Sequence, residues 1–463
     1  MLRIYRYALV GLLGVLPVAT RAAEGDPKVP LEKYKLDNGL EVIVHPDKTV
    51  PLAYVSVWYH VASGDETPGK SGFAHLFEHM MFQGSKHVGE DKHFEILRNV
   101  GASTVNGSTS VDRTNYYEQV PSNQLEVALW LESDRMGYML PLLTEKSLAN
   151  QREVVRNERR QRYDNTPYGK ERFALSRLLY AEGHPYRHLT IGRHEDLAAA
   201  SLEDVKSFFR KWYVPSNATL LVAGDIDVPE AKKLIEKWFG GFPKAPQPQR
   251  RLVPPTPVTE TKRETVKDEF AKLRRVHYAW HTPKMFAPGD AEFDVIASVL
   301  GRSGTGRLYK ILVHEKQLAQ NVAAFQQSQG FSSIFHVIAD LKPEADQAEV
   351  EKILDQEIER LADEPITERE RKRVITEIEA SFVRGLETLV GRGETAQQYN
   401  HFLGNPDSFT ADLDRYRSTK ADRIEAYANE YLDKDKRVEV ITVPDAPAEP
   451  QASAGKPGSK EVN

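Results

Sequence analysis

The residues of this sequence best suited to chemistry are His75, Glu78 and His79, which lie within five positions of one another. They belong to the stretch 71–85, SGFAHLFEHMMFQGS, whose apolar residues recur at the spacing of a helix. That spacing puts His75 and His79 one turn apart on the same side, so both imidazoles can reach one ion. Two such histidines suit a tetrahedral zinc ion, and a neighbouring glutamate can take a proton from the water that zinc acidifies. The pattern predicts a metal site with an activated water; the alternative is an amphipathic helix whose histidines have only structural roles.

A zinc site of this kind needs a third protein ligand, and the helix predicted over 145–162 offers two acidic candidates. At 100° per residue, Val154 and Val155 mark the buried side of that helix. Glu158 falls between the two valines, whereas Glu153 lies nearly opposite them. We therefore expect Glu158 to point inward as the third ligand. The alternative for Glu158 is a surface acid that pairs with a neighbouring arginine.

The composition excludes several classes of function. The chain has 463 residues, 40% of them hydrophobic, which is enough for sizeable cores in more than one domain. Its formal net charge is only −5, and lysine and arginine are dispersed among aspartate and glutamate, so no nucleic acid partner is predicted. The sequence contains no cysteine, which excludes disulfides and lipid attachment through a cysteine.

The N-terminal segment has the three parts of a secretory signal peptide. Arg3 and Arg6 precede an apolar run over 8–20, and the residues around Ala22 resemble a cleavage site. We expect 1–22 to be removed and the mature protein to be periplasmic or secreted. Because the apolar run is short for a membrane span, no stable span is predicted after cleavage; a retained signal anchor is the alternative.

The second half of the chain repeats the first at an offset of about 220 residues. The segment 55–60, VSVWYH, has its counterpart in 276–281, VHYAWH, and 201–225 has a parallel in 419–443. Equal offsets at both ends indicate duplication of one domain that combines strands and helices, so the predicted fold class is α+β. Only the first copy carries the H-x-x-E-H motif. Where the second copy should place the corresponding helix, 293–300 reads FDVIASVL.

A proline-rich stretch marks the boundary between the two copies, because repeated prolines neither continue a helix nor pair within a central strand. The expected organisation is a signal peptide (1–22), an N-terminal domain with the H-x-x-E-H motif (23–242), a linker (243–262), a C-terminal domain (263–445) and a disordered tail (446–463).

The motifs, in their order along the chain, resemble the pitrilysin and insulinase family of zinc peptidases, in particular the shorter two-domain type similar to mitochondrial processing peptidases. The matching segments are 63–80, 82–85, 106–117 (NGSTSVDRTNYY), 152–158 (REVVRNE), 213–225 (YVPSNATLLVAGD) and 301–322. The resemblance implies two homologous domains that form a clamshell around a cavity, and a zinc-dependent endopeptidase that hydrolyses unfolded peptides. It implies that His75, His79 and Glu158 bind zinc and that Glu78 is the general base. Because the gap from His79 to Glu158 is a little longer than in typical family members, Glu153 remains the fallback ligand.

The resemblance also implies a strand beside the cleft. Family members place an Asn-x-x-Thr strand there, which here consists of Asn106, Gly107, Ser108 and Thr109. These residues are expected to bind substrate by pairing with its backbone as an added strand. Ordinary strand and turn chemistry is the alternative for them.

One segment departs from the family pattern. Family members that act alone usually carry an arginine and a tyrosine in a segment like L-R-E-K-x-x-L-A-Y, and these side chains hold the substrate carbonyl. Here 312–320 reads LVHEKQLAQ, with Val313 and Gln320 at those positions; a shift by one places His314 at the first and still leaves Gln320. We therefore expect the metal-bearing subunit of a heterodimer, whose homologous partner supplies the arginine and tyrosine. A stand-alone peptidase or a homodimer is the alternative.

Two other classes of function fit the sequence less well. A metal-binding but non-catalytic assembly subunit has no need of a base beside two ligands, yet Glu78 is present. The glycine-rich segment 301–307 could be mistaken for a phosphate-binding loop. It lacks the Gly-Lys-Ser/Thr ending of such loops, so a tight turn between two helices is predicted there.

Overall fold

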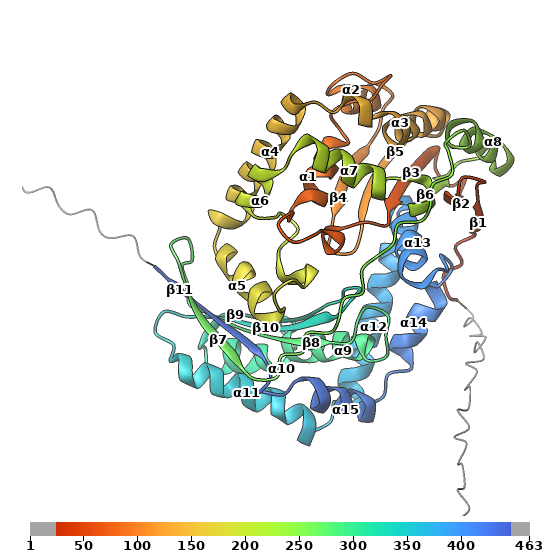
Figure 1. The fold of residues 1–463 in the computed structure, drawn as a ribbon. Helices are drawn as coiled ribbons and strands as arrows, with labels where there is room; N and C mark the ends of the chain where they lie inside the picture. The colour runs from red at the N-terminus through yellow and green to blue at the C-terminus, as the bar shows by residue number, and fades with distance from the viewer. Residues whose placement is uncertain (1–24, 446–463) are drawn as a thin grey trace, which may run out of the picture.

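The computed structural model describes residues 25–445, which form two lobes that face each other (Figure 1). Each lobe consists of one sheet with helices packed on it, and cavities lie between the lobes. The predicted clamshell of two α+β domains is therefore confirmed. The predicted signal peptide and tail lie outside the described residues. Within the described part of the chain, no helix combines the length and the apolar character needed to span a membrane.

The first lobe is built on a six-stranded sheet with the order β1-β2-β6-β3-β5-β4. Its strands are β1 (Glu32–Lys35), β2 (Glu41–Pro46), β3 (Leu52–Tyr59), β4 (Thr104–Thr109), β5 (Thr114–Pro121) and β6 (Ala218–Gly224). Its helices are α1 (Phe73–Met80), α2 (Lys92–Asn99), α3 (Leu125–Tyr138), α4 (Glu145–Arg159), α5 (Gly169–Leu179), α6 (His194–Ala199), α7 (Leu202–Trp212) and α8 (Val228–Phe239). Strand β4 ends the sheet, so no strand within residues 25–445 pairs with its outer edge.

The second lobe repeats this order in five strands, β7-β11-β8-β10-β9. Its strands are β7 (Lys262–Asp268), β8 (Arg275–Thr282), β9 (Ala319–Gln327), β10 (Ser333–Leu341) and β11 (Val438–Pro444). Its helices are α9 (Asp290–Gly301), α10 (Arg307–Tyr309), α11 (Gln347–Asp363), α12 (Glu368–Gly385), α13 (Leu389–Leu403), α14 (Phe409–Arg417) and α15 (Ala421–Tyr431). Each sheet has one parallel pair among the described strands: β2 with β6, the second and third strands of the first sheet, and β7 with β11, the first and second strands of the second. Helix α9 stands where the first lobe has α1, and the glycine-rich turn lies between α9 and α10 as predicted.

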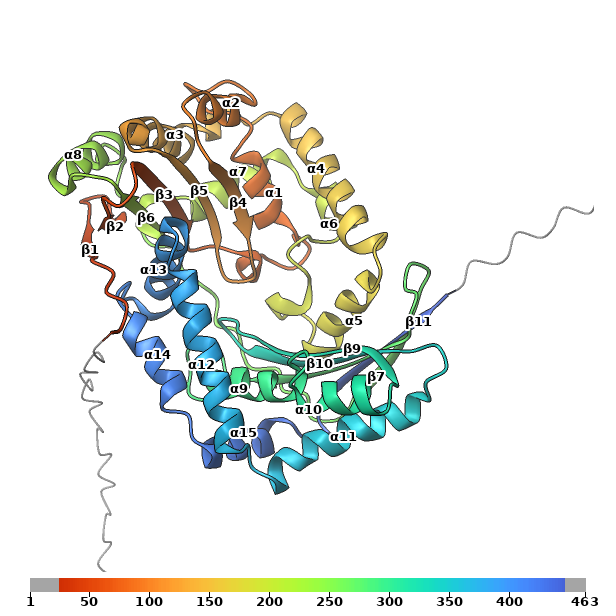
Figure 2. The ribbon, with the colours of Figure 1, turned by 180° about the vertical axis from the view of Figure 1, so that it is seen from behind.

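The lobes exchange helices. Helix α5 of the first lobe packs on the second sheet, where its Leu175 and Leu179 join a core with Val438 and Val440 of β11. Helix α13 of the second lobe packs on the first sheet, and Figure 2 shows α12 and α13 reaching up to it. These two helices are related by the duplication. Each sheet is thus covered on one face by a helix from the other half, which joins the lobes by more than the linker.

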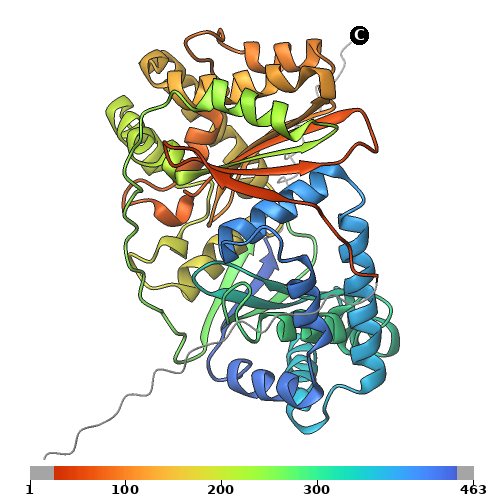
Figure 3. The same ribbon diagram turned by 90° about the vertical axis from the view of Figure 1, so that its right-hand side faces the viewer.

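The helix exchange explains why β3 is apolar along nearly its whole length. Val55 and Val57 belong to the core beneath the first lobe's own helices, whereas Tyr54 belongs to the core beneath α13. Because both faces of the strand are covered, both sets of alternating side chains are buried. The chain between α8 and β7, residues 240–261, runs down one side of the molecule from lobe to lobe (Figure 3).

Candidate active site and metal centre

Helix α1 carries the H-x-x-E-H motif, and its first turn is held from outside the helix. Its N-cap is Gly72, at φ 87°, which has no side chain to accept from the first amides. The carboxylate of Glu66 does so instead, accepting from the backbone amide of Gly72 (3.0 Å) and from that of Ala74 (2.7 Å). Glycine is required at this N-cap, because a Cβ there would lie 2.9 Å from the Cα of Gly192. The orientation of α1 is therefore set by a buried acid and a glycine contact.

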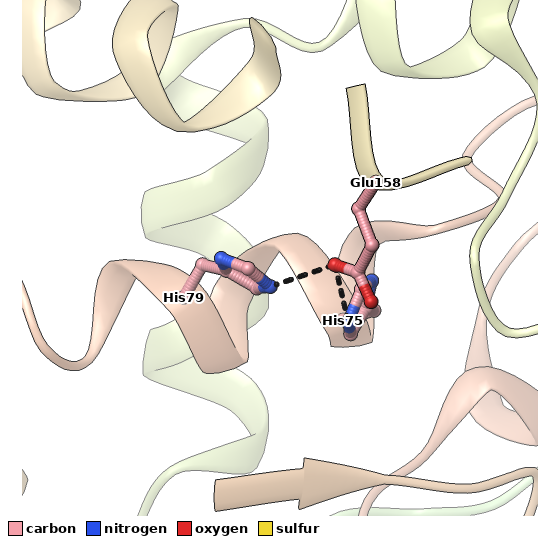
Figure 4. Close-up of side chains that lie close together, drawn as sticks. All are labelled: His75, His79 and Glu158. Carbon is pink, nitrogen blue, oxygen red and sulfur yellow. Dashed lines mark ion pairs between the residues drawn. The ribbon is translucent and has the colours of Figure 1, made fainter. Parts of the chain in front are cut away.

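The predicted ligands converge. The Nε2 atoms of His75 and His79 lie 3.6 Å and 3.3 Å from the Oε2 atom of Glu158 (Figure 4). Ligand atoms around one tetrahedral zinc ion are roughly 3.3 Å apart, given bonds of about 2.0–2.1 Å. Two imidazole nitrogens and one carboxylate oxygen are also the donor set of a catalytic zinc site, which leaves a position for water. The three residues fit the ion in both chemistry and spacing.

The protonation of these side chains suits a cation. Burial lowers the pKa of His75 to about 4, and the neighbouring His79 adds to this effect, so the imidazole of His75 is neutral near pH 7. Burial raises the pKa of Glu158, but the two histidines and Arg162 outweigh it, and the net shift is downward. A neutral imidazole and an ionised carboxylate are the forms that bind a metal.

The two acids of α4 point in different directions. Glu158 faces α1, whereas the side chain of Glu153 is 56% exposed and pairs with Arg156. The expectation that Val154 marks the buried side is wrong, since its side chain is 40% exposed. Helix α4 meets the lobe along a narrow stripe that includes Val155, and Val154 lies a further 100° around the helix, toward solvent.

Glu78, the predicted base, lies on the same helix as the two histidines and is buried beside them. It is 8% exposed, and its Oε2 atom accepts a hydrogen bond of 2.6 Å from the hydroxyl of Thr109. Burial raises the pKa of Glu78, against the opposing effects of this bond and of His79. A carboxylate with a raised pKa is better matched to proton transfer near neutral pH than an exposed one.

The predicted substrate strand is the edge strand β4. Asn106 and Ser108 pair with β5 on one side, and no other strand follows β4 in the sheet. A Cβ at Gly107 would lie 3.1 Å from the Tyr116 ring, which is why this position suits glycine. Thr109, at the end of β4, links the strand to Glu78. A free edge next to the metal ligands is the geometry that strand addition requires.

Arg162 is a site residue that sequence reasoning did not single out. It lies in the π-helical turn Arg160–Asp164 that continues α4, and its Nη1 atom is 2.9 Å from the Oε1 atom of Glu158. The sequence presents pairing with an arginine as the alternative to metal binding by Glu158. The two roles coexist, because one oxygen of Glu158 faces the histidines and the other faces Arg162. The charged stretch RNERRQR was the available signal.

The residues at the expected arginine and tyrosine positions lie in the second lobe. Val313 packs against that lobe's core, and the Gln320 side chain is exposed at the start of β9. The ring of His314 contacts that of Tyr309, with centroids 5.2 Å apart. None of these three side chains brings a cation or a phenol to the positions in question.

A second group of potential ligands, His93, Glu118 and Glu132, is buried in the first lobe, with one ligand atom of each within 4.8 Å of the others. Arg135 already supplies a positive charge there. It donates from Nε to Glu132 (2.9 Å), and its Nη2 lies 4.0 Å from Glu118. Burial raises the pKa of Glu118, and so does the charge of Glu132. We assign this group to a buried ion network of the core.

Comparison with known proteins agrees with this geometry. The family model described as Insulinase (Peptidase family M16) matches residues 41–182, and the one described as Peptidase M16 inactive domain matches residues 199–378. The zinc protease PqqE of Helicobacter pylori is 28% identical over 446 residues, which cover 94% of this chain and 98% of the relative. The uncharacterized zinc protease YmxG of Bacillus subtilis is 23% identical, over 89% of this chain and 98% of the relative.

Solved structures share the fold over nearly the whole chain. The crystal structure of a protease from Helicobacter pylori superposes with a TM-score of 0.82 at 26% identity and covers 90% of this chain and 100% of that one. The first half of the periplasmic protease PqqL from Escherichia coli has a TM-score of 0.75 at 18% identity, over 92% of this chain and 94% of that one, and shows the fold alone. The matches to both halves, together with the convergent motif and the duplicated lobes, place this chain in the insulinase family, peptidase family M16.

Proposed function

We propose that this protein is a zinc-dependent endopeptidase that hydrolyses unfolded peptides. The observation that carries the proposal is the meeting of His75, His79 and Glu158, with Glu78 on the same helix turn as the two histidines. Relatives that cover nearly the full chain are named zinc proteases, which supports zinc as the cofactor. The free edge of β4 beside these residues favours substrates that can pair with it as extended, unfolded chains.

The proposed mechanism assigns one step to each side chain. His75, His79 and Glu158 would hold zinc, which when bound would supply a Lewis acid for the scissile carbonyl and lower the pKa of the attacking water. Glu78 takes a proton from that water and passes it to the leaving amine. Thr109 keeps one Glu78 oxygen engaged, so the other is directed toward the water. Backbone pairing along 106–109 holds the peptide extended beside these groups.

Assembly with a homologous partner is the finer part of the proposal. Val313 and Gln320 leave the second lobe without the arginine and tyrosine expected to stabilise the developing oxyanion, and removal of one such donor costs about 100-fold or more in rate. We propose that a related chain supplies them in a heterodimer. Size-exclusion chromatography and peptidase assays of the purified chain, with and without such a homologue, test this. Full activity of the chain alone would rule the heterodimer out in favour of a stand-alone enzyme or homodimer.

Export is proposed on the sequence of 1–22 and on the periplasmic location stated for the Escherichia coli structure. Fractionation of cells that produce the full chain, with N-terminal sequencing of the mature protein, tests it. A protein retained whole in the cytoplasm would contradict it.

The function is tested by separating metal binding from hydrolysis. Glu78→Gln should retain one zinc per chain and lose peptidase activity by about 100-fold or more, the usual contribution of a general base. His75→Ala should lose both the metal and the activity, because a ligand is removed. Metal analysis and cleavage of an unstructured peptide, with and without a chelator, give the readouts. A Glu78→Gln protein that cleaves normally would refute the assignment.

A further inference from the structure

The tips of two hairpins that the duplication relates meet across the cleft. One is the turn between β4 and β5, residues 110–113; the other is the loop between β9 and β10, residues 328–332. The Oδ2 atom of Asp112 accepts a 3.0 Å hydrogen bond from the backbone amide of Gly330. This contact joins the two lobes at the end of the proposed substrate strand.

A tyrosine completes the contact. The hydroxyl of Tyr186 donates to the Oδ1 atom of Asp112 and accepts from the backbone amide of Phe331 at 3.2 Å. Tyr186 is 3% exposed. A Cβ at Gly330 would lie 2.6 Å from Asp112 Oδ1, so a larger residue there would displace the Asp112 carboxylate. We call Asp112, Tyr186, Gly330 and Phe331 the clasp.

The clasp is fixed on the side of the first lobe. The amide of Gly64 donates to the carbonyl of Val111 at 3.0 Å, and the amide of Ser63 donates to the carbonyl of Ser110 at 3.3 Å. A Cβ at Gly64 would lie 2.4 Å from that Val111 oxygen. The hairpin tip that presents Asp112 is therefore held by the backbone of its own lobe. The loop of the second lobe is held in the same way, since the amide of Met285 donates to the carbonyl of Gln329 at 2.9 Å, so opening of the clasp separates two anchored tips.

The clasp lies where a bound peptide would leave β4. Thr109, the last residue of β4, contacts Glu78, and Asp112 follows three residues later. Two cavities of about 620 and 590 Å³ flank this point, and both are lined by Val111 and Thr190 of the first lobe and by Gln327 and Gln329 of the second. A chain extended along β4 beyond Thr109 advances about 3.3 Å per residue and meets the clasp within a few residues.

We propose that the clasp determines which peptide lengths are cleaved: while closed it blocks the path beyond Thr109, and longer chains are cleaved only after it opens. This inference rests on the proposed peptidase function. Asp112 and Gly330 are then specificity-determining residues without a part in the bond-breaking step. Loss of the hydrogen bonds to the Asp112 carboxylate should lower the ratio of closed to open clasp by about tenfold or more.

Substitution of the aspartate gives the first test. Asp112→Ala should raise the cleavage rate of a long peptide relative to a short one by about tenfold. The probes are a quenched fluorescent peptide that the wild-type chain cleaves and the same peptide extended at either end with a Gly/Ser segment. Asp112→Asn keeps an acceptor for the Gly330 amide and should give a smaller change. A long-to-short ratio that is the same in all three proteins would overturn the proposal.

A reversible disulfide crosslink gives the second test. Because the chain has no cysteine, no other disulfide can form in the double variant. A Cβ at position 330 would lie 3.2 Å from Asp112 Cγ, so the double variant Asp112→Cys/Gly330→Cys is within reach of a disulfide. The oxidised form should still cleave the short peptide, but its rate of cleavage of the long peptide should fall by about tenfold or more. Reduction of the disulfide should restore cleavage of the long peptide. Equal loss of both peptides would overturn length selection.

The controls separate failure of the clasp from failure of the peptidase function. Each single cysteine variant shows the effect of substitution without the crosslink, and zinc content and thermal midpoint show that the variants fold. If wild-type protein loaded with zinc cleaves no peptide at all, the proposed function fails. If it cleaves peptides and the length ratio follows neither the oxidation state nor the substitution of Asp112, the clasp proposal alone fails.

Discussion

At the scale of single residues, Glu158 divides its two oxygens between the metal site and Arg162. Side chains that hold the outer atoms of a metal ligand fix its orientation, and their removal typically costs 10–100-fold in metal affinity. The ion pair is on the surface, since the Arg162 side chain is 73% exposed, so we attribute its value to orientation of Glu158 more than to net stability.

The Arg162→Ala variant should therefore raise the zinc dissociation constant by about 10–100-fold, measured by competition with a chelator, with little change in thermal midpoint. Arg160→Ala is the matched control. Arg160 lies in the same π-helical turn but donates to Asn157, so its loss should leave zinc affinity unchanged. Equal effects of the two substitutions would show that only the surface charge matters.

Thr109 is the second residue whose role can be isolated. Thr109→Val keeps the shape of the side chain and removes the donor to Glu78, which should lower kcat/KM by about tenfold or more, because a hydrogen bond to a charged group contributes roughly 1.5–3 kcal/mol. Thr109→Ser should recover most of the activity. Both variants should bind zinc normally. A Thr109→Val enzyme with wild-type kcat/KM would exclude this positioning role.

At the scale of elements, α1 depends on a cap from outside the helix. Glu66→Ala leaves the amides of Gly72 and Ala74 without an acceptor in a buried place, at a cost of about 1–3 kcal/mol for each. We expect a lower thermal midpoint and weaker zinc binding, because His75 follows directly in the same turn.

The matched variant is Glu66→Gln, which keeps one acceptor oxygen. Burial raises the pKa of Glu66, so loss of its charge should cost less than loss of its oxygens, and Glu66→Gln should lie between Glu66→Ala and the wild type. Zinc affinity and thermal midpoint measure both effects. If Glu66→Ala bound zinc as tightly as the wild type, the cap would have no part in placing the ligands.

At the scale of the whole molecule, Glu394 of α13 ties the second lobe to the first sheet. Its Oε1 atom accepts from the side chains of Tyr54 (2.8 Å), Ser56 (2.8 Å) and Trp58 (3.2 Å) on β3. Its Oε2 atom accepts from Asn115 on β5 at 2.7 Å. One carboxylate from the second half thus satisfies four donors of the first sheet, beneath the exchanged helix.

The Glu394→Ala variant should destabilise the protein by several kcal/mol, since each buried donor left without an acceptor costs roughly 1–3 kcal/mol. The thermal midpoint should fall, and the radius measured by small-angle scattering should rise if the lobes separate. Gln398→Ala, one turn further along α13 and outside this network, is the control. If both variants unfolded at the same temperature, the carboxylate would not be what joins the lobes.

The amino-acid sequence by itself determined the features that depend on local spacing. Residues four apart in a helix share a face whatever surrounds them, so His75 and His79 had to point to one ion if the stretch was helical. The duplication can be detected in the sequence for a similar reason. Each strand and helix forms from neighbouring residues, and an offset of about 220 residues relates those of the two halves. The preference for Glu158 over Glu153 also came from helical angles, although the same angles misplaced Val154.

Only the tertiary structure decided the relations between residues far apart in the chain. Glu158 contacts both His79 and Arg162 only because folding turns its side chain toward α1. The clasp joins Asp112 and Gly330, which are 218 residues apart, and the exchange of α5 and α13 places each helix on the sheet of the other half. The spacing of apolar residues determines which side of a helix or strand is apolar. The path of the chain through both sheets determines which other element packs against that side.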